Sequence, residues 1–172
     1  MSNWYHLPVD WAVSNGITAG TSASTFDPQL ACTRAQVVTF LWRTAGNPAP
    51  SSGRNPFRDV KSSAYYYQAV LWAVEKGITA GTSATTFSPD STCTRGQVAT
   101  FLWRFEGSPL VKTHNPFRDV SADAYYADAV LWAVEKGVTA GVDSNHFAPR
   151  APAPARMWSR SSTATERCNR KM

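Results

Sequence analysis

The chain has 172 residues, 43% of them hydrophobic, which is enough for one domain of ordinary size with a buried core. Its formal charge of +5 would suit a protein that binds nucleic acid or an anionic membrane. However, residues 1–149 hold 11 Lys and Arg against 11 Asp and Glu, whereas residues 150–172 hold 6 basic residues against Glu166 alone. Because the basic excess is confined to the last segment, we expect no nucleic-acid partner. The apolar runs are also too short for a membrane span, so we expect no membrane insertion.

Internal repeats organise most of the chain. The strings DWAVSNGITAGTSASTFDP, LWAVEKGITAGTSATTFSP and LWAVEKGVTAGVDSNHFAP begin at Asp10, Leu71 and Leu131, and NPFRDV begins at Asn55 and Asn115. Self-similarity at a fixed period is typical of repeat architectures. We therefore divide the chain into repeat 1 without its FRDV segment (1–47), a complete repeat 2 (55–108), the first half of repeat 3 (115–149), and a tail (150–172).

Each repeat is predicted to form a helix, a loop and a second helix, so the expected fold class is all-α. In repeat 2 the apolar residues of 69–74 recur at helical spacing after three tyrosines. Gly77 then stands where a left-handed residue commonly ends a helix. The tryptophans of both helices are expected in the core, with some aromatic surface left for a sugar ring; these are Trp11, Trp42, Trp72, Trp103 and Trp132.

The second helix has a clear start signal in two repeats. Thr94 is a good N-cap, and Gln97 three residues later completes a capping box. Thr33 and Gln36 form the same pattern in repeat 1. The sequence therefore predicts that these helices begin directly after the threonines.

The third repeat breaks off after Pro149, and we interpret the residues that follow as the product of a frameshift. Met157 and Trp158 each have a single codon, so the frame read one base earlier must contain the valine codon GTG at their junction. With synonymous codons chosen for the neighbouring residues, that frame reads CTRAHVVAFLYRDG. Its cysteine falls four residues after Pro149, as the cysteines of the earlier repeats follow their prolines. The tail is therefore expected to be disordered and without function.

Signals for enzyme chemistry, metals or cofactors do not emerge from the sequence. Cys32 and Cys93 precede the N-caps of the second helices, where they are expected to act as small buried hydrophobic residues. The three histidines neither recur in each repeat nor show metal-ligand spacing; they are His6, His114 and His146. We therefore expect a protein that is not an enzyme and needs no metal or cofactor.

Four charged residues are candidates for binding. Arg34 and Arg95 occupy the first position of a helix, where a positive charge opposes the helix dipole, so another use is expected for them. A guanidinium and the free amides of a helix start together suit an anion. Asp59 and Asp119 could cap a helix or turn, accept sugar hydroxyls, or orient the arginine of a neighbouring repeat.

The loop between the helices supplies two further candidates. Thr82 and Ser83 follow the last glycine of GITAG in repeat 2. Their hydroxyls could hydrogen-bond a ligand, and ordinary turn chemistry explains them equally well.

The segments FRDV, AVLWAVEKGITAGTS and FSPDSTCTRGQVATFLWR are similar to the S-layer homology module of bacterial cell-surface proteins, over residues 4–149. The resemblance implies a pseudo-threefold arrangement of three units, of which the third is incomplete here. It also implies a non-catalytic role, anchoring an exported protein to the bacterial cell wall or S-layer through acidic, often pyruvylated, secondary wall polysaccharide. Among the residues expected to contact the glycan are Arg34 and Arg95, with Gln36 and Gln97 where the family usually has glutamate.

Two other functions stay open. The incomplete third repeat could pair with another chain, which would make the protein a self-associating part of a surface layer. Alternatively, the chain could be a fragment of a larger surface enzyme whose catalytic region lies elsewhere. We also expect that no signal peptide is present in this fragment, because MSNWYHLPVDWAV lacks the charged and apolar regions of one.

Overall fold

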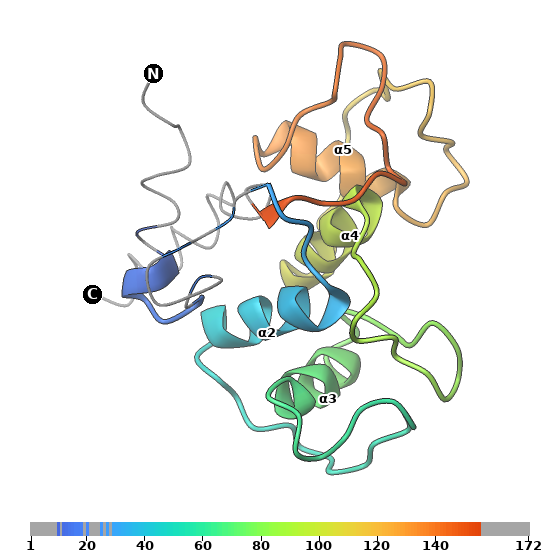
Figure 1. Cartoon of the computed structure of the whole chain (residues 1–172). Coiled ribbons are helices and arrows are strands. Elements are labelled where there is room, and N and C mark those ends of the chain that lie inside the picture. Colours follow the sequence, from blue (N-terminus) through green and yellow to red (C-terminus); the bar gives the residue numbers. More distant parts are fainter. Residues whose placement is uncertain are drawn as a thin grey trace.

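The computed structural model is mainly helical, as expected, and it describes residues 10, 12–18, 20, 25, 27 and 29–155. Its helices include α2 (Arg34–Thr44), α3 (Tyr67–Glu75), α4 (Arg95–Phe105) and α5 (Ala127–Glu135), joined by long loops (Figure 1). Only isolated β-bridges, and no strand, occur in the described part of the chain. None of the helices found there is long and apolar enough to span a membrane.

The predicted starts of α2 and α4 are confirmed. The side chain of Thr33 accepts from the amide of Gln36 (3.3 Å), and the amide of Thr33 donates to Gln36 Oε1 (2.8 Å). The same two bonds join Thr94 and Gln97, at 3.3 and 3.0 Å. Each capping box satisfies amides that the first helical turn would leave without a partner.

The predicted end of α3 is also confirmed. Gly77 has φ +68° directly after the C-cap Lys76, and Gly137 has φ +67° after α5. Residues with a Cβ adopt this left-handed conformation at a cost, which explains glycine at both places. The loop that follows can then turn back along the helix.

Second helices pack against the first helix of the next repeat. α2 lies against α3, α4 lies against α5, and α2 also contacts α4 near the centre of the molecule (Figure 1). As expected, Trp72 and Trp132 are buried in the shared core, and Trp42 and Trp103 are partly buried against it. Trp11 lies outside the described residues. The interfaces between neighbouring repeats therefore contribute to the stability of the whole.

A closed ring of backbone hydrogen bonds joins the three repeats. The amide of Cys93 donates to the carbonyl of Cys32 (2.8 Å), and the amide of Ala153 donates to the carbonyl of Cys93 (2.9 Å). The amide of Cys32 donates to the carbonyl of Ala153 (3.1 Å) and so closes the ring. Each repeat thus contributes one residue to a common centre, in agreement with the pseudo-threefold arrangement that the family resemblance implied.

The first residues of the tail belong to the fold, contrary to the expectation of an idle tail from residue 150. Ala153 is 1% exposed and takes the place that cysteine has in the other repeats. The carbonyl of Ala151 accepts from the amide of Arg95 (2.9 Å), and the amide of Ala155 donates to Leu30 (2.8 Å). Backbone bonds need no particular side chains, so these residues can close the ring although the helix signal has been lost. Residues 156–172, which include Cys168 and most of the segment that the shifted frame would read as CTRAHVVAFLYRDG, lie outside the described part.

The two ring cysteines are buried and free, as expected of small hydrophobic residues. Burial raises the pKa of Cys32 to about 11 and that of Cys93 to about 12. A thiol with so high a pKa stays protonated at neutral pH, so it is a poor nucleophile and a poor metal ligand. Within the described residues, no three histidine, cysteine or acidic side chains gather as a metal site would require.

Candidate functional site at the seams between repeats

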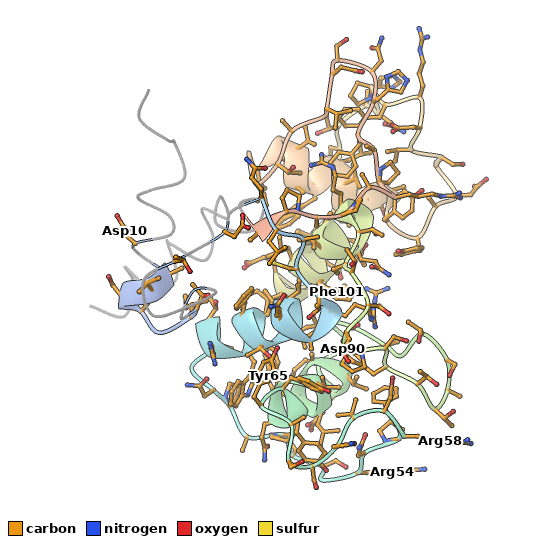
Figure 2. The ribbon with its side chains drawn as sticks, in the orientation of Figure 1. Asp10, Arg54, Arg58, Tyr65, Asp90 and Phe101 are labelled. Atoms are coloured by element: carbon orange, nitrogen blue, oxygen red, sulfur yellow. The ribbon has the colours of Figure 1, made fainter. Side chains whose placement is uncertain are left out.

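The first seam is the contact between the start of α2 in repeat 1 and the 80–88 loop of repeat 2. Arg34 Nε donates to the carbonyl of Phe87 (2.9 Å), and Nη2 donates to the carbonyl of Ala80 (2.9 Å). Its guanidinium carbon lies 4.7 Å from the centre of the Phe87 ring and 5.5 Å from that of Phe101, which reaches from α4 (Figure 2). The side chain is only 4% exposed. Arg34 therefore fastens repeat 2 to repeat 1.

The second seam repeats this arrangement between α4 and the 140–148 loop of repeat 3. Arg95 Nε donates to Phe147 (2.9 Å), Nη2 donates to Ala140 (2.7 Å), and the guanidinium lies 4.4 Å from the Phe147 ring centre. Arg95 is more exposed than Arg34, and its bond to Ala140 is open to solvent. Of the two arginines, Arg95 is thus the more accessible to a ligand.

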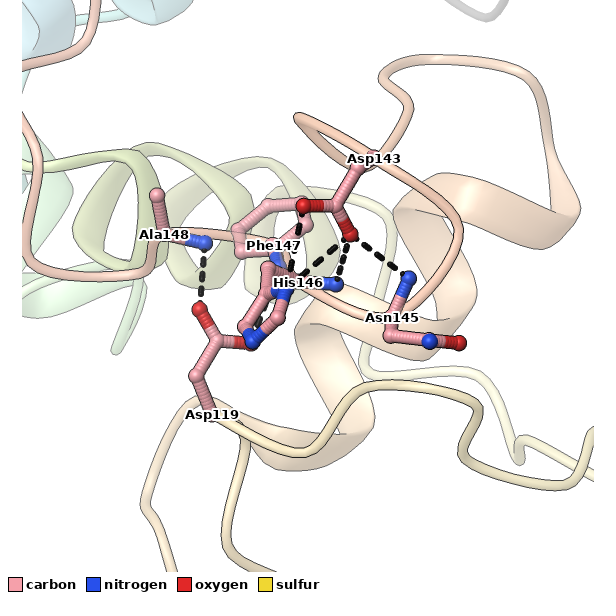
Figure 3. A network of polar contacts seen from close by, with 6 residues as sticks. All are labelled: Asp119, Asp143, Asn145, His146, Phe147 and Ala148. Carbon is pink, nitrogen blue, oxygen red and sulfur yellow. Dashed lines mark hydrogen bonds and ion pairs between the residues drawn. The ribbon is translucent and has the colours of Figure 1, made fainter.

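The aspartates of FRDV hold the same loops from the other side. Asp59 accepts from the amides of Phe87 (2.9 Å) and Ser88 (2.7 Å). Asp119 accepts from Phe147 (2.9 Å) and Ala148 (2.7 Å), as Figure 3 shows.

Of the three roles considered for these aspartates, capping the Tyr-rich helix is not the one observed, because α3 and α5 have no side-chain cap. Instead, each phenylalanine of the loop is held at its amide by an aspartate and at its carbonyl by the arginine of the preceding repeat. The aspartate therefore supports the acceptor to which the arginine binds, and so orients the arginine indirectly.

A glycine makes each loop compact. A Cβ on Gly81 would lie 2.6 Å from Phe57 Cε1, and one on Gly141 would lie 2.7 Å from Phe117 Cε1. Such distances are too short for any side chain. In repeats 2 and 3 the last glycine of the GITAG-like segment is therefore required for packing the FRDV segment against the loop.

Thr82 and Ser83 serve the turn chemistry of the first loop. The Thr82 amide and hydroxyl donate to the carbonyl of Thr86 (2.8 and 3.2 Å), and Ser83 Oγ accepts from the amide of Thr85 (3.3 Å). Thr82 Oγ1 also lies 2.7 Å from Ser88 Oγ. Both residues are exposed, so their hydroxyls border the first seam.

The two seams differ in the chemistry of their exposed edge. Val142 and Ala148 replace the hydroxyl pair of Thr82 and Ser88 in the second loop. There, an Asp143 side chain accepts from the amide of His146 (2.8 Å) and lies 3.0 Å from His146 Nδ1 (Figure 3). The amide of Asn145 is the main cause of a lowered pKa of Asp143.

The structure brings together most of the residues that the sequence singled out, but around unexpected partners. Arg34 and Asp59 converge on the 80–88 loop, of which Thr82 is a part. Gln36 and Gln97 stay in their capping boxes through Oε1. The phenylalanine rings beside the arginines were not among the predicted site residues. Their recurrence in TFSP and HFAP is the signal that could have pointed to them.

The S-layer homology domain model matches residues 1–38, 56–99 and 116–153 of the chain. The chain belongs to the S-layer homology domain family. The third match ends at residue 153, inside the ring of backbone bonds that unites the repeats.

Curated proteins with similar sequences include a surface-layer protein, an endoglucanase and a cellulosome-anchoring protein. The chain is 36% identical over 89 residues to a surface-layer 125 kDa protein of Lysinibacillus sphaericus (52% of the chain, 8% of that protein). It is 33% identical over 106 residues to an endoglucanase of Bacillus sp. strain KSM-635 (62% and 11%). It is 27% identical over 143 residues to the cellulosome-anchoring protein of Acetivibrio thermocellus (77% and 31%). The chain thus spans less than a third of the length of each of these relatives.

Proposed function

We propose that this S-layer homology chain is a non-catalytic anchoring module that holds a longer exported protein on the bacterial surface by binding acidic secondary wall polysaccharide, including pyruvylated forms. The observation that carries the proposal is the match to three family repeats, which a ring of backbone hydrogen bonds joins. At each of the two seams, an arginine and an aspartate hold a loop between the repeats. A relative that is named a cellulosome-anchoring protein supports the anchoring role.

The seams divide the proposed binding tasks among their residues. Asp59, Asp119 and Arg34 hold the loops in place through buried or half-buried bonds. The exposed hydroxyls of Thr82 and Ser83 offer donors and acceptors to sugar hydroxyls at the first seam. At the second seam the half-exposed guanidinium of Arg95 suits the acidic group of a glycan, because its planar fork of donors matches a carboxylate. Gln36 and Gln97, at the helix starts, complete the proposed sites.

Co-sedimentation with cell-wall sacculi tests the proposal. The purified chain is expected to pellet with sacculi that retain their secondary polysaccharide and to stay in solution with sacculi stripped of it. Equal binding to both preparations would contradict the proposal, because the target would then be peptidoglycan or any surface.

An arginine variant refines the test. Arg95→Ala is expected to weaken binding several-fold while the circular dichroism spectrum stays that of a folded protein. An unchanged affinity would remove Arg95 from the site. Sedimentation velocity on the same samples tests the alternative of self-association through the third repeat, which stays a prediction: a monomer at micromolar concentration would contradict it.

A further inference from the structure

Cys32 and Cys93 stand directly opposite each other where repeat 1 meets repeat 2. An antiparallel β-bridge pairs Thr33 with Thr92, so the next pair along the two segments is Cys32 and Cys93. Their backbones are joined by the 2.8 Å hydrogen bond from the amide of Cys93 to the carbonyl of Cys32. Opposite residues of an antiparallel pair direct their side chains to the same side. The two thiols therefore extend from adjacent points of the backbone into the same part of the core.

The spacing of such a pair suits a disulfide. Directly opposite residues of an antiparallel pair have Cα atoms about 4.5–5.5 Å apart, and a disulfide joins Cα atoms about 4.4–6.8 Å apart. Both side chains belong to one buried core, with Cys32 6% and Cys93 0% exposed. Burial is the main cause of the raised pKa of Cys93, and Cys32 adds to it. The backbone is thus already placed for a bond between the two sulfur atoms, which are free thiols in this structure.

The third repeat shows what packing alone requires at this position. Ala153 is the equivalent of the two cysteines in the ring of backbone hydrogen bonds, and it is 1% exposed. Alanine therefore fills the place and closes the ring without a thiol. Packing does not explain why the two other positions, which face each other, both carry cysteine.

We propose that Cys32 and Cys93 form a disulfide when the chain folds in an oxidising medium, and that this bond holds repeat 1 to repeat 2 covalently at the centre of the ring. The oxidant is a small-molecule disulfide. One cysteine thiolate attacks a sulfur of the oxidant, which gives a mixed disulfide and releases one small thiol. The other cysteine thiolate then attacks the protein sulfur of that mixed disulfide and releases the second small thiol. The two protein thiols lose two protons and two electrons, and the oxidant is reduced to two thiols.

The exchange takes place before the core closes. In the folded, reduced chain both thiols are buried and their pKa values are raised, so few thiolates are present to react. In the unfolded chain the same thiols are accessible and ionise more readily. Disulfides form and persist outside the cell, which is where the proposed function places the chain. The disulfide does not depend on glycan binding, so it can be tested without a ligand.

The bond is expected to stabilise the fold. It closes a loop of about 60 residues, and a cross-link over a long loop restricts the unfolded chain strongly. The loop contains α2, α3 and the 80–88 segment that Arg34 holds. The whole first seam would thus lie within the covalent loop.

Refolding of the full chain under two redox conditions tests the proposal. The reduced chain is unfolded in urea and diluted into buffer that contains either oxidised glutathione or dithiothreitol. Remaining thiols are then alkylated in urea, and the peptides are analysed by mass spectrometry. The glutathione sample is expected to yield the peptides of Cys32 and Cys93 joined by a disulfide. Its Tm is expected to be several degrees higher than that of the dithiothreitol sample.

Two variants separate this bond from other effects of oxidation. Cys93→Ala is expected to fold, as Ala153 does in its place, and to have the same Tm in both buffers. Cys168→Ala leaves the pair intact and is expected to keep the full difference in Tm. Alkylated Cys32 and Cys93 in the glutathione sample, or a link of either to Cys168 alone, would overturn the proposal. A Cys32–Cys93 link without a rise in Tm would show that the bond does not hold the repeats together.

Discussion

Replacing Asp59 with alanine tests whether the FRDV aspartate holds the loop of its repeat. The substitution removes two hydrogen bonds, to the amides of Phe87 (2.9 Å) and Ser88 (2.7 Å). A hydrogen bond to a charged group contributes about 1.5–3 kcal/mol, and the half-exposed site argues for the lower end of that range. Ser88 also has φ +59°, a conformation that needs support from its surroundings. We therefore expect the free energy of unfolding to fall by about 3 kcal/mol.

Urea unfolding followed by tryptophan fluorescence and circular dichroism measures this loss. For a protein of this size, a loss of about 3 kcal/mol lowers the Tm by roughly 6–12 °C. Asp59→Asn keeps one acceptor oxygen and is expected to lose about half as much. Asp123→Ala, at an exposed position, is the matched control and is expected to stay within about 0.5 kcal/mol of wild type. A loss below about 1 kcal/mol for Asp59→Ala would show that the two hydrogen bonds of Asp59 to the loop contribute little to stability.

The sharing of Phe87 by Asp59 and Arg34 gives a second measurement. Because one residue holds the amide and the other the carbonyl of the same peptide segment, their effects are expected to be non-additive. A double-mutant cycle with Arg34→Met is expected to give a coupling of about 0.5–1 kcal/mol or more. Additive losses would show that the two contacts act independently.

Three further changes have expected outcomes. A chain that ends at residue 155 is expected to have the Tm of the whole chain. A chain that ends at residue 149 is expected to have a Tm several degrees lower, because the ring of backbone hydrogen bonds is opened. Equal Tm values for the two shortened chains would contradict the role of residues 150–155. Gly96→Ala is expected to raise the free energy of unfolding in urea by about 0.5 kcal/mol, because alanine has the higher helix propensity and repeat 1 accommodates Ala35 at the equivalent position. The 3.1 Å contact of the new Cβ with the Pro149 carbonyl offsets part of that gain. Cys32 and Cys93 are expected to resist alkylation at pH 8 until the protein unfolds. Because the fold raises their pKa values, the thiols of the unfolded chain ionise at a lower pH than those of the folded chain. The free energy of unfolding is therefore expected to fall as the pH rises from about 9 toward 11.

Local sequence determined the helices of this protein and the points at which they begin and end. A capping box joins Thr33 to Gln36, three residues apart, and the left-handed conformation of Gly77 is a property of one residue. The burial of Trp72 and Trp132 likewise follows from helical periodicity. Such signals act within one turn of helix, so no knowledge of the neighbouring repeats is needed to read them.

Only the tertiary structure decided what the charged residues do. The partners of Arg34 are 46 and 53 residues away along the chain, and those of Asp59 are 28 and 29 residues away. Sequence marked both as unusual but left their roles open, because the acceptors are backbone groups, which every residue has. The role of Ala153 also depends on its backbone. Nothing in its side chain predicts that its amide and carbonyl close the ring of hydrogen bonds. Where a backbone group finds its partner depends on how the repeats stack, and that arrangement is settled by the packing of all three.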